Sequence, residues 1–97
     1  MPALPMTLWL ELTINAESGG VYTAVGDGGR SRGPYQIQQK IWEFYGGKKP
    51  WIMWAHDPRE SRRVCKLVLR ACAAKCKKEG KDINFKNVRY YYTHGGF

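Results

Sequence analysis

The chain has 97 residues, enough for one small domain with a modest hydrophobic core. Sixteen Lys and Arg residues against eight Asp and Glu residues give a formal charge of +8, which attracts polyanions in general and selects none of them. Since no apolar run approaches transmembrane length, composition excludes a membrane-spanning protein. We therefore expect a single soluble domain over residues 1–97.

The first predicted element is a short helix. Thr7 can cap a helix that runs to about Ala16, in which Leu8, Leu12 and Ala16 repeat four residues apart on one face. Glu17 then lies at the C-terminal end of this helix. A carboxylate is unfavourable there because of the helix dipole, and an unfavourable placement raises the pKa of the carboxyl group.

A β-hairpin and a second helix are predicted next. Residues 21–25 are β-prone, residues 26–29 (Gly-Asp-Gly-Gly) are a strong turn signal, and a second extended segment leads into Pro34. Residues 38–45 suit a short helix, which ends before the following glycines. Three side chains of this helix are expected to face the core: Ile41, Trp42 and Tyr45.

The clearest helix signal covers residues 58–79. Asp57 is a good N-cap, Pro58 suits the first helical position, Glu60 provides the second half of a capping box, and Gly80 ends the helix. The predicted core-facing residues are Val64, Leu67, Val68 and Ala71. The opposite face carries a basic stripe, which consists of Arg59, Arg63, Lys66, Arg70 and Lys77.

A last helix is predicted after Asp82, with Phe85, Val88 and Tyr92 facing inward, and Gly95-Gly96 ends it. The order of helix, hairpin and helices predicts an α+β fold with one cleft between the hairpin and the helical part.

The three cysteines, Cys65, Cys72 and Cys76, all fall in the long predicted helix. Residues four apart on a helix rarely achieve disulfide geometry, and no His lies nearby in the sequence to complete a metal site. We expect buried thiols in the core. His56 is a lone loop histidine without a second ligand, so we expect no metal.

Two carboxylates flank the predicted hairpin. Glu17 precedes Ser18-Gly19-Gly20, and Asp27 occupies the turn. A glycosidase needs one protonated carboxyl group to donate to the leaving oxygen and a second, ionised one to attack the sugar, activate water or stabilise the transition state. Asp-Gly is also a common hairpin turn without any catalytic role, and the turn would hold the carboxylate over the cleft.

These motifs carry a family resemblance. Glu-Ser-Gly-Gly (17–20), Gly-Pro-Tyr-Gln-Ile (33–37), Trp42 and Tyr-Thr-His-Gly-Gly (92–96) together resemble an invertebrate-type (destabilase-like) lysozyme over almost the whole chain. The Glu-Ser and Ser-x-Gly-x-x-Gln half of the pattern is also similar to goose-type lysozymes and soluble lytic transglycosylases. The invertebrate-type lysozyme family is usually rich in disulfides, and this chain has three cysteines, so it resembles a distant or cysteine-stripped relative.

The resemblance implies a mostly helical, lysozyme-like fold with a small β-hairpin beside the active-site cleft. It implies a muramidase that hydrolyses the bond between N-acetylmuramic acid and N-acetylglucosamine in peptidoglycan, without a cofactor. Glu17 would be the acid, and Asp27 the nucleophile or the base that activates water. We assign Trp42 and Tyr92 to packing. The expected substrate-binding residues are Ser18, Ser31, Gly33, Tyr35, Gln36, Tyr91 and His94.

Two alternatives stay open. A lytic transglycosylase needs only one catalytic carboxyl group, whereas a cationic protein that binds walls or membranes needs neither and uses the basic stripe. We expect peptidoglycan as partner, with anionic wall polymers on the basic face, and a monomer. No nucleic-acid recognition motif appears, so we expect no nucleic-acid partner.

The N-terminus predicts where the protein acts. No basic segment precedes its apolar stretch, which Pro5 and Glu11 interrupt, so it does not look like a secretory signal. We expect an endolysin-like protein that stays in the cytoplasm until lysis, or a secreted chain whose leader has been removed.

Overall fold

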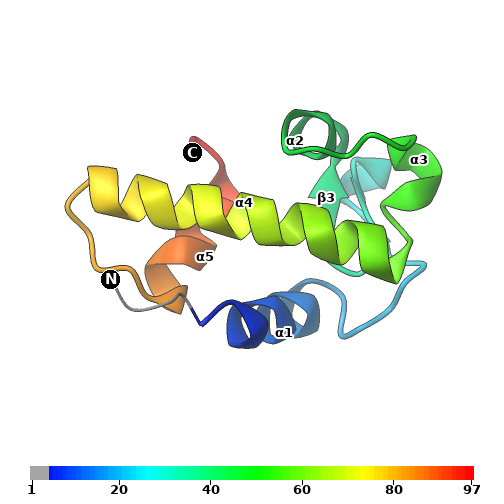
Figure 1. Cartoon of the computed structure of the whole chain (residues 1–97). Helices are drawn as coiled ribbons and strands as arrows, with labels where there is room; N and C mark the ends of the chain where they lie inside the picture. The colour runs from blue at the N-terminus through cyan, green and yellow to red at the C-terminus, as the bar shows by residue number, and fades with distance from the viewer. Residues whose placement is uncertain (1–4) are drawn as a thin grey trace.

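The structure is a computed structural model that describes residues 5–97. Helices dominate, and a small three-stranded antiparallel sheet completes an α+β fold, which confirms that part of the prediction (Figure 1). No helix within the described residues is long and apolar enough to span a bilayer. In chain order the elements are α1 (Met6–Glu17), β1 (Val25–Gly26), the 3-10 turn η1 (Asp27–Gly29), β2 (Ser31–Arg32), β3 (Ile37–Gln38), α2 (Gln39–Phe44), α3 (Trp51–Trp54), α4 (Pro58–Lys78) and α5 (Phe85–His94).

The long helix α4 runs through the middle of the molecule. Helices α1 and α5 pack against it, and the sheet with α2 and α3 lies beside its N-terminal half (Figure 1). The N-cap prediction is confirmed, because the Asp57 carboxylate accepts hydrogen bonds from the backbone N–H groups of Arg59 (3.1 Å) and Glu60 (2.8 Å). The reciprocal half of the capping box is wrong: the Glu60 carboxylate pairs with Arg63 at 3.2 Å instead.

The core forms where α4 meets α1, α5 and the sheet. Trp42 of α2 is fully buried, and its indole N–H donates to the carbonyl of Lys49 at 2.8 Å. All three cysteines are free and buried, as expected. Burial raises the pKa of the Cys65 and Cys72 thiols to about 12, so these thiols are unreactive at neutral pH.

The first helix differs from its prediction. It begins at Met6 after Pro5, so Thr7 lies inside the helix and does not cap it. The face that carries Leu8 and Leu12 is exposed, with 54% and 38% of their surfaces accessible. The residues that α1 buries are Trp9, Leu10 and Thr13.

The hairpin is shorter than predicted and gains a third strand. Only Val25 and Gly26 of the first segment pair with β2, and β2 then pairs with β3. Gly33, between β2 and β3, has a positive φ of 83°, and a Cβ there would lie 1.7 Å from the carbonyl oxygen of Ala55. This close approach ties the sheet to the segment that connects α3 and α4.

The last helix forms nearly as predicted. Asn84 caps α5 by accepting the backbone N–H of Asn87 at 2.9 Å. Val88 is fully buried, and the helix ends at His94, directly before Gly95, whose φ of 78° breaks the helical path. Thr93 and His94 are the last two residues of α5.

Candidate functional site

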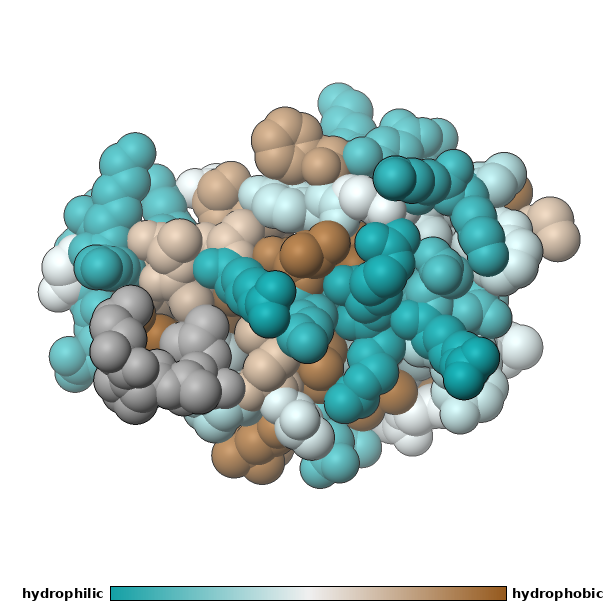
Figure 2. All heavy atoms as spheres, in the orientation of Figure 1, coloured by the Kyte–Doolittle hydropathy of each residue, from teal (hydrophilic) through white to brown (hydrophobic). Residues whose placement is uncertain are grey.

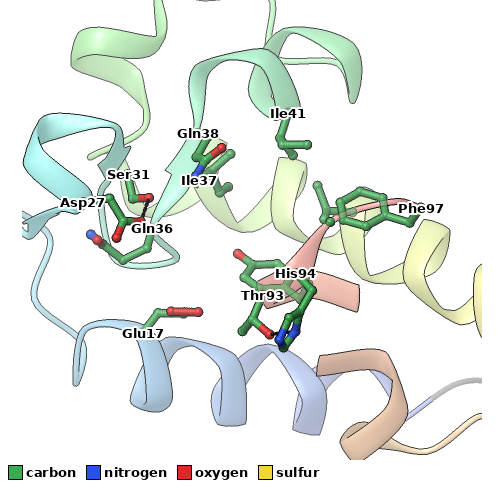
Figure 3. Close-up of a pocket in the computed structure, with 13 residues that line it drawn as sticks. Glu17, Asp27, Ser31, Gln36, Ile37, Gln38, Ile41, Thr93, His94 and Phe97 are labelled. Carbon is green, nitrogen blue, oxygen red and sulfur yellow. Dashed lines mark hydrogen bonds between the residues drawn. The ribbon is translucent and has the colours of Figure 1, made fainter. Parts of the chain in front are cut away.

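A cleft of about 380 Å³ opens between the end of α1, the small sheet and the end of α5. Glu17 enters it from α1, and Asp27 from the η1 turn on the opposite wall (Figure 3). His94 closes one side, and Val68 of α4 contributes to the lining from behind. The cleft is therefore assembled from segments far apart in the sequence.

Glu17 is the more enclosed of the two acidic residues. Its side chain is 18% exposed, and it is the last residue of α1. Burial raises the pKa of its carboxyl group above 4.5, and the negative charge of Asp27 raises it further. The Arg89 guanidinium, 3.7 Å away, acts in the opposite direction without cancelling the effect of burial. A carboxyl group in this setting can hold a proton to donate.

Asp27 is held in place by its backbone and by one strong hydrogen bond. The Ser31 hydroxyl donates to the Asp27 carboxylate at 2.7 Å (Figure 3). Among the described residues, Asp27 and Gln36 are the non-glycine residues with a positive φ, 52° and 53°, and both line the cleft. Such conformations are unfavourable by about 1 kcal/mol or more, and they gather at functional sites.

Gln36 lies in the loop between β2 and β3, where two side-chain hydrogen bonds fix it. Its side-chain amide donates to the carbonyls of Gly33 (2.9 Å) and Ala24 (3.2 Å). These bonds hold together the turn that carries Asp27 and Ser31. Gln36 thus lines the cleft as predicted and also maintains its shape.

His94 lines the cleft, and contacts within α5 fix its ring. Its Nδ1 lies 2.8 Å from the carbonyl oxygen of Tyr90 and 3.0 Å from the hydroxyl oxygen of Thr93, and the tautomer with the hydrogen on Nδ1 donates to that carbonyl. In the neutral ring Nε2 is then left as an acceptor for a hydroxyl or amide group of a ligand. The ring also stacks on Tyr90 with 4.2 Å between centroids, which fixes its orientation.

Four predicted substrate-binding residues lie outside the residues that line the cleft. The Ser18 hydroxyl donates to the carbonyl of Pro34 at 2.7 Å and so joins α1 to the sheet. Gly33 packs against the α3–α4 connection. The expectation that Tyr35 and Tyr91 face the cleft is wrong, since these residues are 3% and 7% exposed and belong to the core.

Tyr92, which we assigned to packing alone, both packs against the core and lines the cleft. Its hydroxyl donates to the carbonyl of Tyr35 at 2.6 Å. Further lining residues that the motifs did not indicate include Thr93, Ile41 and Phe97. Thr93 lies next to His94 in the Tyr-Thr-His-Gly-Gly motif, so its position in that motif could have identified it as a lining residue.

The raised pKa of Glu17 predicts a pH-dependent contribution to stability. Between pH 4.5 and the pKa in the folded state, the native protein binds more protons at this group than the unfolded chain does. The contribution is therefore complete below pH 4.5 and is lost as the pH rises through the folded-state pKa. We therefore compare the free energy of unfolding of the native chain with that of the Glu17→Gln variant. The difference, native minus variant, should fall as the pH rises over this range.

Urea unfolding of both proteins at a series of pH values measures this difference. Other carboxyl groups titrate in both proteins and cancel from it. If this difference rises with pH instead, the pKa of Glu17 is not raised in the folded protein.

Comparisons with protein-family models, curated protein sequences and solved structures found no match to this chain. Its chemistry therefore has to be argued from the cleft itself.

Proposed function

We propose that this chain is a muramidase, which hydrolyses the glycosidic bond between N-acetylmuramic acid and N-acetylglucosamine in peptidoglycan. The observation that carries the proposal is the pair of carboxyl groups on opposite walls of one cleft, of which only Glu17 is substantially desolvated. Two carboxyl groups in different environments are the arrangement that glycoside hydrolysis needs. The order of motifs along the chain, which resembles lysozymes, supports the same assignment.

In this mechanism Glu17 is the general acid. It protonates the glycosidic oxygen as the bond to the sugar breaks, and its raised pKa keeps the proton available at a higher pH than an ordinary Glu would. Asp27 is the ionised partner, which attacks the sugar, activates a water molecule or stabilises the positive charge that develops on the ring. The hydrogen bond from Ser31 orients the Asp27 carboxylate for that task.

The rest of the cleft suits a sugar chain. His94 offers Nε2 as an acceptor, and Thr93 beside it is a further polar residue of the lining. Ile41 and Phe97 supply apolar surface at the other end of the cleft (Figure 3). A lining that combines polar groups with apolar surface is typical of sites that bind small ligands.

A lytic transglycosylase is the second candidate. In that reaction one carboxyl group performs all proton transfer, and a hydroxyl group of the substrate attacks in place of water. The asymmetry of the site favours it in one respect: Glu17 is half-buried, whereas Asp27 lies at the exposed mouth of the cleft.

Mass spectrometry of muropeptides after digestion of purified cell walls tests both candidates. Hydrolysis leaves products with a free reducing end, whereas transglycosylation leaves an internal anhydro ring and products lighter by one water. We expect the hydrolytic products. If walls yield no new glycan ends, neither enzymatic proposal stands, and a non-enzymatic cationic protein remains.

A further inference from the structure

The outer face of α4 carries an unusual concentration of positive charge. Eight of the sixteen Lys and Arg residues of the chain lie on this helix, against one acidic residue, Glu60. The basic stripe predicted from the sequence is exposed at all five positions, Arg59, Arg63, Lys66, Arg70 and Lys77. Figure 2, viewed with α4 in front, shows hydrophilic side chains along this helix.

Most of this charge is not neutralised within the protein. Of the five stripe residues, only Arg63 appears in an ion pair between described residues, with Glu60 at 3.2 Å. Like charges spaced along one helix face repel each other and give no stability to the fold. The stripe is therefore better explained by a binding partner than by a contribution to the stability of the fold.

The stripe and the cleft lie on opposite sides of α4. Val68 of α4 contributes to the cleft lining. At about 100° per residue, the five stripe positions are rotated by about 140° to 180° from Val68 around the helix axis. The figures agree, since α4 lies in front in Figure 1 and behind the cleft residues in Figure 3. A ligand on the stripe cannot be the same stretch of chain that occupies the cleft.

We propose that the outer face of α4 is a second binding surface, which holds a linear, phosphate-bearing polymer of the cell wall while the cleft engages a glycan strand. This inference rests on the proposed function, because a glycan in the cleft places the wall's own anionic polymers nearby. From Arg59 to Lys77 the stripe extends over about 27 Å at 1.5 Å per residue, long enough to contact several successive phosphate groups. The enzyme would thus be attached to the wall through one side and cleave through the other.

The geometry makes the two surfaces separable in experiments. A triple variant, Arg59→Gln, Lys66→Gln and Arg70→Gln, removes three stripe charges that take part in no ion pair between described residues. A matched control, Lys40→Gln, Lys48→Gln and Lys86→Gln, lowers the charge equally at exposed positions outside α4. Both triples change only exposed side chains, so both proteins are expected to fold.

Sedimentation with purified walls measures binding, with teichoic acid present or extracted, in a Glu17→Gln background that prevents digestion. For walls that retain the polymer, we expect the stripe triple to weaken binding by about 10-fold to 100-fold and the control triple by about 3-fold or less. Extraction of the polymer should remove the difference between them. Because this readout needs no cleavage, it is independent of whether the cleft is a muramidase site.

Three results would overturn the proposal. Equal weakening of binding by the two triples would show that the effect depends on net charge alone. Binding to extracted walls as tight as binding to intact ones would show that the polymer is not the ligand. Tighter binding of the stripe to duplex DNA than to intact walls would make a nucleic acid the partner. In a separate arm, soluble polyphosphate should displace the native protein from walls and leave cleavage of short soluble glycans unchanged. Equal inhibition of both would show that the two surfaces are not independent.

Discussion

If the proposed function holds, replacement of Glu17 by Gln is expected to remove most glycan cleavage, with a loss of about 10²-fold to 10⁴-fold, the range typical for removal of a general acid. Glutamine keeps the shape of the side chain and cannot supply the proton. The Arg89 guanidinium, 3.7 Å from the Glu17 carboxylate, can still contact the amide oxygen, so the fold should be kept. Release of reducing ends from a soluble muropeptide oligomer measures the loss.

Glu11→Gln is the matched control for this variant. Glu11 lies on the same helix, α1, and is exposed to solvent. The control should retain the native rate, and circular dichroism should show the same helical content for both variants. A Glu17→Gln protein that cleaves at the native rate would show that another group supplies the proton.

Local signals predicted the helices well where the chain itself contains the determinants. Asp57 and Pro58 begin α4 because both act within the first turn, and Gly80 lies directly after its C-cap residue. The period of the apolar residues also identified Val64 and Val68 as core residues. Each of these features depends on neighbours within a few positions.

Orientation within the site was harder to predict, because it depends on contacts between distant segments. The spacing of α5 groups Val88 and Tyr92 on one face, yet the hydroxyl of Tyr92 reaches the loop between β2 and β3, and Tyr92 also lines the cleft. Tyr35 is 3% exposed, and the hydroxyl of Tyr92, which comes from α5, donates to its carbonyl at 2.6 Å. No local motif contains that information.

The pairing of Glu17 with Arg89 is another long-range feature that the motifs did not reveal. Seventy-two positions separate the two residues, and the guanidinium keeps one nitrogen, Nη1, buried without a hydrogen-bond partner. The sequence predicted a raised pKa for Glu17 from the helix dipole. In the structure burial is the largest cause, and Arg89 limits the effect.

Replacement of Asp27 by Asn tests whether cleavage needs the second carboxylate. Asparagine tolerates the left-handed backbone conformation at this position, where φ is 52°, and its side-chain oxygen can accept the hydrogen bond from Ser31. The variant thus removes the negative charge with little change to the turn. If Asp27 is the nucleophile or base, the rate should fall by about 10²-fold or more, comparably to Glu17→Gln.

The same variant gives a second, independent readout through Glu17. Since the charge of Asp27 raises the pKa of Glu17, its removal should lower that pKa and move the alkaline limb of any residual activity to lower pH. Asp82→Asn, at an exposed position beyond α4, is the control and should change neither rate nor pH profile. If Asp27→Asn keeps nearly full activity while Glu17→Gln is inactive, the two-carboxylate mechanism is wrong. The single-acid transglycosylase then replaces it, with Asp27 acting only on the pKa of the acid.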